Sequence, residues 1–266
     1  DFQIDNGTDI IVICGTSGEA STMSHDEQIE VVSACVSHVN GRVPVIAGAG
    51  ANCTDEALNL AKRSEKAGAD GLLVVTPYYN KATQKGLEEY YTTVGNSVDI
   101  PIIMYNVPGR TGLNISVDTV VELAKHKNIQ AMKDATDNIA YAMEVLAKTA
   151  DLDFDLYSGC DDNILPFMAA GGKGVISVTS NLYPEAVEKL TQLILKGNIK
   201  EAQPLAYALD PISRLLFIDV NPIMPKAALA KMGVCGECLR LPLITTTDEN
   251  KKALFDAMDE FEKLGY

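Results

Sequence analysis

The chain has 266 residues, of which 47% are hydrophobic and 22% are charged, a composition that suits one α/β barrel or two small domains and excludes a disordered chain. The formal net charge of −14 argues against nucleic acid as a partner, because such a chain repels phosphate backbones. No run approaches about 18 consecutive apolar residues, so neither a transmembrane helix nor a membrane partner is expected, and residues 1–8 are too polar for a signal peptide.

Short apolar runs alternate with amphipathic stretches from residue 9 to residue 196. The runs are typical of parallel strands buried on both faces, and they occupy 9–14, 43–47, 71–75, 100–104, 129–132, 154–157 and 174–178. The amphipathic stretches predict helices at 25–38, 55–67, 83–96, 117–126, 137–149, 161–170 and 184–196. Ser24, three residues before Glu27, indicates a capping box at the start of the first. Repeated β–α–β units predict a parallel sheet.

Seven strand–helix units are visible, whereas a closed (β/α)₈ TIM barrel has eight. An open doubly wound sheet is the alternative, but no Gly-x-Gly-x-x-Gly motif follows the first run. Residues 1–7 are typical of a helix end with Gly7 as its C-cap, so we expect a barrel without its first strand. The predicted domains are a barrel at 1–198 and a C-terminal helical region at 199–266, with helices at 199–213, 223–232 and 248–264.

Six cysteines are spread through the chain, which favours a reduced, intracellular protein. Cys235 and Cys238 have the spacing of a metal or redox pair. They have no second pair and no nearby histidine, so we expect no metal site.

Polar residues gather directly after five of the predicted strands, at 15–19, 76–80, 105–112, 133–136 and 158–159. The carboxyl ends of barrel strands form one face, and active sites lie on that face. The sequence therefore predicts a single site built from these five segments.

Lys133 follows the apolar run 129–132. A lysine there would point into the barrel mouth, where partial removal from water favours the neutral amine that attacks a carbonyl. A surface lysine at a strand edge, or a lysine paired with Asp134, is the alternative. Tyr105 also ends an apolar strand, and its hydroxyl could relay protons or simply be satisfied within a core.

Two further segments carry groups that could bind a carboxylate. The Gly-Thr-Ser-Gly loop at 15–18 offers backbone N–H groups and two hydroxyls, although it could be an ordinary strand-to-helix turn. Arg110 lies in a Pro-Gly-Arg-Thr-Gly turn, where it could bind a carboxylate in a bidentate way or remain a solvated loop residue.

Several longer motifs are specific in combination. They are GTSGEAST at 15–22, VIAGAGAN at 45–52, TPYYNKATQKGL at 76–87, YNVPGRTGLN at 105–114, KDAT at 133–136, SGCDD at 158–162 and GGKGVISVTSN at 171–181. Through them the whole chain resembles the dihydrodipicolinate synthase branch of the N-acetylneuraminate lyase-like class I aldolases. The resemblance implies additional N-terminal residues that include the first barrel strand.

The resemblance also implies catalytic roles. Lys133 would form a Schiff base with pyruvate, and Tyr105 would transfer protons. Thr16 would link Tyr105 to Tyr79, which would reach into the site of a neighbouring subunit of a homotetramer.

It implies four substrate-binding positions as well. Ser17 stands where the family has a threonine that holds the pyruvate carboxylate, and Arg110 would bind the carboxylate of aspartate semialdehyde. The backbone of Gly159 and Ile176 would line the pocket. The segment 221–226 departs from the family pattern at its Met-Pro pair.

The implied activity is that of a lyase, an aldol condensation of pyruvate with L-aspartate 4-semialdehyde that gives 4-hydroxy-tetrahydrodipicolinate in lysine and diaminopimelate biosynthesis, with no metal and no organic cofactor. The alternatives are a sialic-acid or keto-deoxy-sugar-acid lyase of the same family, and a barrel that has lost catalysis. A lysine-binding regulatory site is implied at Ala20, Ser21, His25, Gln28, Asn52, Glu56 and Tyr78.

Overall fold

The structure is a computed structural model that describes residues 1–265; Tyr266, the last residue of the predicted C-terminal region, lies outside the described residues. Seven strands form one parallel sheet in chain order. They are β1 (Ile11–Ile13), β2 (Val45–Gly48), β3 (Gly71–Val75), β4 (Ile102–Asn106), β5 (Ile129–Asp134), β6 (Asp155–Ser158) and β7 (Gly174–Val175). All seven predicted strands are confirmed, and the sheet is parallel as expected.

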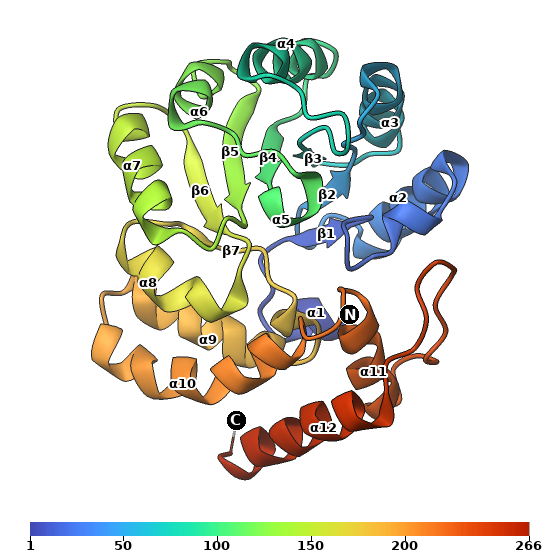
Figure 1. Ribbon diagram of the computed structural model, residues 1–266, viewed down its shortest axis with the longest axis vertical. Coiled ribbons are helices and arrows are strands. Elements are labelled where there is room, and N and C mark those ends of the chain that lie inside the picture. The colour runs from blue at the N-terminus through green and yellow to red at the C-terminus, as the bar shows by residue number, and fades with distance from the viewer. Residues whose placement is uncertain (266) are drawn as a thin grey trace.

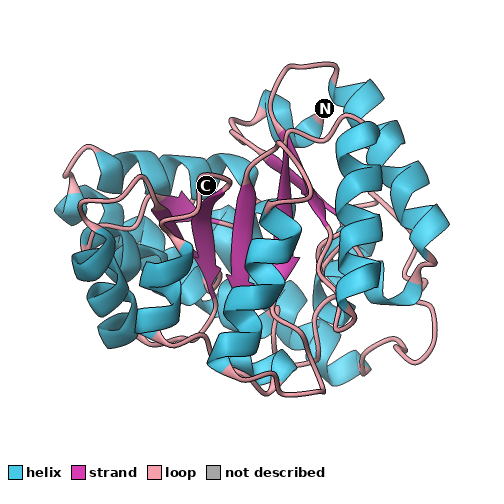
Figure 2. Cartoon of the chain, turned by 90° about the horizontal axis from the view of Figure 1, so that it is seen from above, coloured by secondary structure: helices cyan, strands magenta, loops and turns pink. Residues whose placement is uncertain are grey.

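Helices connect the strands and lie outside the curled sheet (Figures 1 and 2). The longer ones are α2 (His25–Val39), α3 (Thr54–Lys66), α4 (Gln84–Gly95), α6 (Val117–Leu123), α7 (Ile139–Thr149), α8 (Ile164–Ala169) and α9 (Pro184–Leu195). Single turns are α1 (Phe2–Asp5), η1 (Ala20–Thr22), α5 (Pro108–Thr111), η2 (Asp161–Asn163) and η3 (Thr179–Asn181). The predicted capping box is confirmed, because Ser24 accepts from the backbone of Glu27 and Glu27 accepts from the backbone of Ser24.

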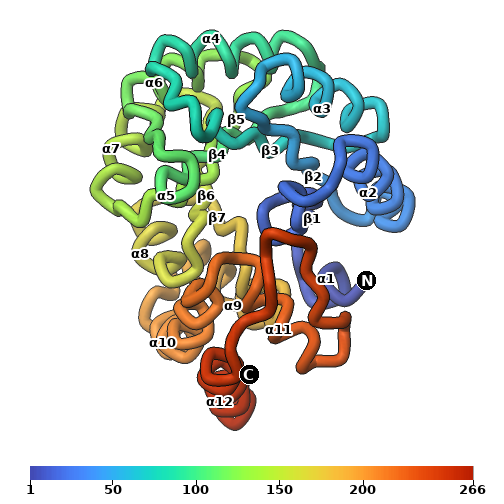
Figure 3. Tube along the Cα trace, turned by 45° about the vertical axis from the view of Figure 1, so that its right-hand side comes forward, coloured from blue at the N-terminus to red at the C-terminus, as the bar shows by residue number. Residues whose placement is uncertain are grey.

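Three further helices follow the strands: α10 (Ile199–Leu215), α11 (Ile223–Lys231) and α12 (Asp248–Lys263). They share a buried apolar core with α8 and α9, built on residues such as Leu190, Leu209 and Met258. Figure 3 shows α12 on the far side of this group from the sheet. None of the helices within residues 1–265 is long and apolar enough to span a membrane.

The two edges of the sheet are β1 and β7, and no backbone ladder within residues 1–265 joins them. The first turn of helix, α1, lies near this opening, where Gln3 donates a hydrogen bond to the carbonyl of Ser180. Asn6, rather than the predicted Gly7, is the cap residue of α1. Gly7 follows with φ +88°, a left-handed conformation that a side chain would strain. The chain can therefore turn sharply from α1 into the approach to β1.

Candidate active site

A cavity of about 820 Å³ lies among the carboxyl ends of the strands and continues down between β1 and β7 towards α9. The polar segments that follow β1, β4, β5 and β6 all contribute to its lining. Four of the five predicted segments thus meet at one face of the sheet. The segment 76–80 after β3 is not part of the lining.

Lys133 is close to the end of β5 and lines the cavity, with only 9% of the residue exposed. In the sheet it pairs with Tyr105 of β4 on one side and with Tyr157 of β6 on the other. Its Nζ lies 4.4 Å from the centre of the Tyr105 ring, a cation–π geometry. No carboxylate among residues 1–265 forms an ion pair with this amine, and the residue is buried, so both alternatives, a surface lysine at a strand edge and a lysine paired with Asp134, are wrong.

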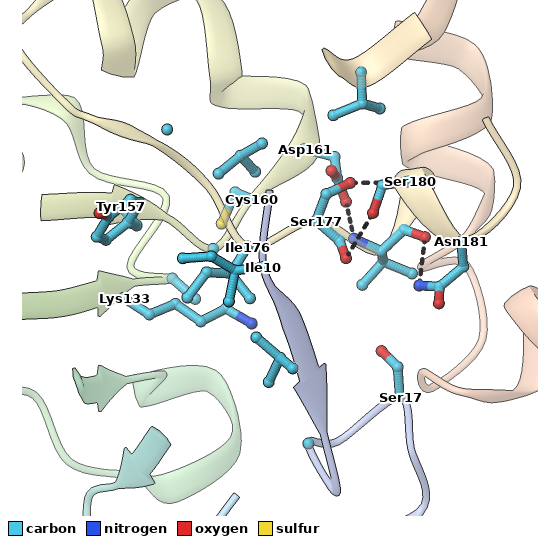
Figure 4. A pocket seen from close by; sticks show the side chains of 18 of the residues that line it. Ile10, Ser17, Lys133, Tyr157, Cys160, Asp161, Ile176, Ser177, Ser180 and Asn181 are labelled. Atoms are coloured by element: carbon cyan, nitrogen blue, oxygen red, sulfur yellow. Dashed lines mark hydrogen bonds between the residues drawn. The ribbon is translucent and has the colours of Figure 1, made fainter. Parts of the chain in front are cut away.

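Tyr105 and Ile176 form an apolar surface beside Lys133. Tyr105 is 8% exposed and belongs to a small buried cluster with Ile46, Leu73 and Val107. Ile176 packs against this cluster and is tied to β6 by a 2.8 Å hydrogen bond from its N–H to the carbonyl of Ser158. Figure 4 shows Ile176 and Lys133 together at the pocket.

Gly159 provides the space that the Lys133 side chain occupies. A Cβ atom at residue 159 would lie 2.8 Å from the Cβ of Ala135 and 3.0 Å from the Cε of Lys133. Contacts this short force neighbouring atoms to move, so a side chain here would displace the lysine. We name Tyr105, Lys133, Gly159 and Ile176 the interior wall of the cavity.

The opposite side of the cavity is built from three polar residues that are far apart in the sequence. The hydroxyl of Ser17 lies 3.2 Å from Oδ1 of Asn221, to which it can donate, and accepts from Nδ2 of Asn221 at 2.9 Å. Arg110 donates from Nη2 to the backbone carbonyl of Asn221 at 3.1 Å. We name Ser17, Arg110 and Asn221 the loop wall.

The sequence assigned no role to Asn221. Yet Asn221 is only 6% exposed and contacts both predicted carboxylate-binding residues. The Asn-Pro pair at 221–222 was the available signal, since such a pair favours a turn. The pattern does not say which loop that turn meets.

An ion pair supports the loop wall from behind. Lys226 of α11 pairs with Glu19 and also donates to the carbonyl of Cys238 at 2.8 Å. Arg240 reaches across to both carboxylate oxygens of Glu27 and to the carbonyl of Thr22. The segment between α11 and α12 is therefore fastened to the loop that carries Ser17.

The two remaining predicted catalytic residues lie in different surroundings. Thr16 lines the cavity next to Ser17. Tyr79 is 89% exposed, has φ +73° and is not part of the lining. Within one copy of the chain, the structure does not bring Tyr79 to the lysine.

Burial changes the protonation of several groups around the lysine. It raises the pKa of the Cys160 thiol to about 12, with the carboxylate of Asp162 acting in the same direction, so the thiol stays protonated near neutral pH. Burial also raises the pKa of Asp134 to about 6, even though the hydroxyl and N–H of Thr136 donate to it.

The residues of the implied lysine site lie outside the cavity, around the starts of α2 and α3 and the loop after β3. Gln28 is 8% exposed and donates to the carbonyl of Ala20 at 3.0 Å. Asn80 donates to the carbonyl of Asn52 at 2.8 Å, which joins the loop after β3 to the start of α3. The other members are Ser21, His25, Glu56 and Tyr78, which are half-buried or exposed.

Within residues 1–265, no three histidine, cysteine, aspartate or glutamate side chains are grouped so that they could hold a metal ion. Cys235 and Cys238 are both exposed and unpaired by a disulfide.

The chain matches the model of the dihydrodipicolinate synthetase family over residues 1–260. It is 49% identical over 262 residues to a 4-hydroxy-tetrahydrodipicolinate synthase of Geobacter sulfurreducens, which covers 98% of this chain and 90% of the relative. A crystal structure of dihydrodipicolinate synthase from Aquifex aeolicus superposes with a TM-score of 0.95 at 43% identity, covering 98% of this chain and 89% of that one.

A further similar structure is that of a chloride-inhibited dihydrodipicolinate synthase from Acinetobacter baumannii, complexed with pyruvate. Its TM-score is 0.96 at 38% identity, and the match covers 98% of this chain and 89% of that one.

Proposed function

The chain belongs to the dihydrodipicolinate synthetase family, and we propose that it catalyses the aldol condensation of pyruvate with L-aspartate 4-semialdehyde to give 4-hydroxy-tetrahydrodipicolinate. The relatives that carry the name of this synthase are similar along nearly the whole chain. The enzyme is thus a lyase of lysine and diaminopimelate biosynthesis, and we place it in the cytoplasm.

The observation that carries this proposal is the environment of Lys133. Its amine enters the cavity, and no carboxylate among residues 1–265 holds it in an ion pair. An amine in this setting can attack a ketone carbonyl. The ring of Tyr105 lies against it.

The proposed reaction begins with attack of the Lys133 amine on the ketone carbon of pyruvate. Loss of water gives an imine, and the protonated imine nitrogen accepts the electron pair released when a methyl proton leaves. The resulting enamine attacks the aldehyde carbon of the second substrate. The amino group of that substrate then displaces the lysine nitrogen and closes the ring. Because the imine itself is the electron sink, the proposal needs no metal and no organic cofactor.

Proton transfer is assigned to Tyr105, Thr16 and Tyr79. The hydroxyl of Tyr105 is placed by a strand in which Tyr105 pairs directly with Lys133, so both side chains face the same cavity. Thr16 lines that cavity from the loop after β1. A positioned hydroxyl contributes roughly 100- to 10,000-fold to such steps.

The loop wall supports the choice of substrate. We assign the pyruvate carboxylate to the hydroxyl of Ser17 and the carboxylate of aspartate semialdehyde to Arg110. Arg110 uses one N–H on Asn221 and retains other donors for a carboxylate. A fixed cation favours a small acidic aldehyde over an uncharged polyhydroxylated chain.

Turnover of one condensation mixture and of two cleavage substrates tests this assignment. The purified chain is incubated with pyruvate and aspartate semialdehyde, with N-acetylneuraminate, and with 2-keto-3-deoxygluconate, and the products are followed by mass spectrometry. We expect product from the first mixture and at most slow cleavage of the two sugar acids. Preferential cleavage of either sugar acid would support the related lyase activity instead.

Tyr79 supports a role for a second copy of the chain. Its exposed ring and left-handed backbone are costly in an isolated chain, and such strain is common at functional contacts. We propose that Tyr79 enters the site of a neighbouring subunit in a homotetramer. Light scattering of the purified protein tests this, and a monomer that is fully active would contradict it.

The sheet itself supports an eighth strand. β1 and β7 each have an edge without a partner in residues 1–265, and the cavity runs between them. We propose that one more parallel strand completes a (β/α)₈ barrel there, with residues 1–198 as the barrel and 199–266 as the C-terminal helical region. Amide exchange of β1 and β7, measured beside that of β3 and β4, reports whether the two edges are paired.

From the family relationship we also propose that lysine inhibits the enzyme. The group around Gln28, Asn52 and Glu56 offers amide and carboxylate groups that suit the charged ends of an amino acid. Initial rates measured with and without millimolar lysine test it, and an unchanged rate would reject it.

A further inference from the structure

Asp161 is a buried carboxylate to which the proposed reaction gives no role. It begins η2, two residues after Gly159, and is 7% exposed while lining the cavity. Burying a carboxylate without compensation costs several kcal/mol. Its hydrogen bonds must therefore account for its position.

One carboxylate oxygen of Asp161 holds the backbone that leaves β7. Oδ2 accepts from the N–H of Val178 at 2.8 Å and from the N–H of Thr179 at 3.2 Å. These residues lie two and three positions after Ile176 of the interior wall. The strand β7 has only two residues, so its own ladder gives this segment little support.

The other oxygen faces a serine hydroxyl. Within residues 1–265, Oδ1 is buried without a hydrogen bond of good geometry, and Ser177 is its neighbour. The Ser177 hydroxyl accepts from the N–H of Ser180 at 2.8 Å, which leaves its own hydrogen free to point at Asp161 (Figure 4). Burial raises the pKa of Asp161, whereas these donors and the charge of Lys133 lower it.

The segment 176–179 is thus fixed at two points. The carbonyl of Ser158 accepts from the N–H of Ile176, and Asp161 accepts from the N–H groups of Val178 and Thr179. Between these points the chain carries the Ile176 side chain onto the cluster that contains Tyr105. Release of the Asp161 end would let Ile176 move relative to Lys133 and Tyr105.

We propose that Asp161 is a positioning residue for the lysine–imine chemistry, which holds the Val178–Thr179 backbone and thereby keeps Ile176 against Tyr105 and beside Lys133. This inference rests on the proposed function of Lys133. Asp161 acts through the segment 176–179 and does not itself contact the reacting carbonyl. Misplacement by about 1 Å at a reacting centre can cost roughly 100-fold in rate.

The test compares Asp161→Ala with Asp161→Asn. The asparagine carbonyl can still accept from both N–H groups, and its amide can donate to the Ser177 hydroxyl, so it keeps the tether without the charge. Asp70→Ala is the matched control, because Asp70 likewise accepts from a backbone N–H, that of Val45 at 2.8 Å, at the start of β2 rather than at the site. If the alanine variant does not fold, Asp161→Ser replaces it, since its shorter hydroxyl cannot reach both donors.

The first readout is hydrogen exchange of the Val178 and Thr179 amides, which does not depend on activity. We expect exchange at least about tenfold faster in Asp161→Ala than in the wild type, and wild-type protection in Asp161→Asn. The second readout is steady-state kinetics, in which kcat of the alanine variant falls about 100-fold. KM for pyruvate should stay within about threefold, because the carboxylate of pyruvate is assigned to the loop wall.

The outcomes separate the inference from the proposed function. A wild-type chain that forms no imine with pyruvate overturns the function and the inference with it, whatever the exchange shows. If the wild type forms the imine and Asp161→Ala keeps its kcat, only the inference is overturned. An Asp161→Asn variant as slow as the alanine variant would also overturn it, because the charge rather than the tether would then matter.

Discussion

On the interior wall, Tyr105 and Lys133 lie opposite each other in a ladder of backbone hydrogen bonds, and both are at least nine-tenths buried. On the loop wall, Ser17 is held by the side chain and Arg110 by the backbone carbonyl of Asn221, which is 204 and 111 residues away from them. Strand pairing fixes the first wall with little freedom, whereas the second depends on the closure of separate loops. We therefore expect changes in the interior wall to affect the chemical step and changes in the loop wall to affect binding.

Gly159→Ala should break the interior wall most strongly. The added Cβ would overlap Ala135 and Lys133, so the lysine must move, and kcat should fall about 100-fold. Gly236→Ala is the control, because no atom lies within 4 Å of that Cβ position. Wild-type kinetics in Gly159→Ala would mean that the lysine is not confined as described.

The pH dependence of the free energy of unfolding tests the burial of Asp134, which lies next to Lys133 on β5. Burial raises its pKa to about 6 in the folded protein, against about 3.9 in an unfolded chain. A folded-state pKa above the unfolded value stabilises the fold most at low pH, and this contribution is lost as the pH rises from about 4 to about 6.

We therefore expect denaturation curves at several pH values to separate wild type from Asp134→Asn. Relative to the variant, the wild type should lose up to about 3 kcal/mol of unfolding free energy between about pH 4 and pH 7. The difference between the two proteins isolates Asp134 from other buried carboxylates. If the unfolding free energies of the two proteins changed with pH in the same way, burial would not raise the pKa of Asp134.

Arg110→Met tests the loop wall. Loss of a charge-assisted hydrogen bond costs about 1.5–3 kcal/mol, so KM for aspartate semialdehyde should rise roughly 10- to 100-fold. Imine formation with pyruvate should be nearly unchanged. Arg214→Met is the matched control, because Arg214 lines another part of the cavity and pairs with Asp210. A large loss of imine formation in Arg110→Met would remove the distinction between the two walls.

Lys226→Met is the smallest of these changes. The pair that Lys226 forms with Glu19 is partly exposed, so its removal should reduce the unfolding free energy by only about 1 kcal/mol. KM for both substrates should rise slightly while kcat stays constant. The exposed pair of Lys252 with Asp256 on α12 provides the control, and Lys252→Met should have a smaller effect still. Equal effects of Lys226→Met and Lys252→Met on stability and KM would show that the pair of Lys226 with Glu19 does not stabilise the loop wall.

The strands and the interior wall could be predicted because their signals are local. Buried parallel strands are continuous apolar runs, and the residue that ends such a run lies at the active face of the sheet. Lys133 and Tyr105 were found in this way, and the family motifs added the roles of Gly159 and Ile176. The functional roles themselves stay predictions until they are measured.

The contacts of the loop wall and of Asp161 could not be predicted in the same way. Nothing near Asn221 says that it meets Ser17, because that contact exists only once α10 and α11 are packed. The bonds from Val178 and Thr179 to Asp161 likewise depend on how β7 leaves the sheet. Side-chain contacts between loops follow from tertiary packing, and a one-dimensional pattern does not encode it.

The most direct test of the account is chemical trapping at Lys133. The chain is incubated with pyruvate, reduced with borohydride, and analysed by intact and peptide mass spectrometry, with Lys133→Met as the control. We predict one reduced pyruvate adduct per chain, located on Lys133 and absent from the variant. A folded wild-type protein that gains no adduct, or gains it on another lysine, would contradict the assignment of the interior wall as the site of imine chemistry.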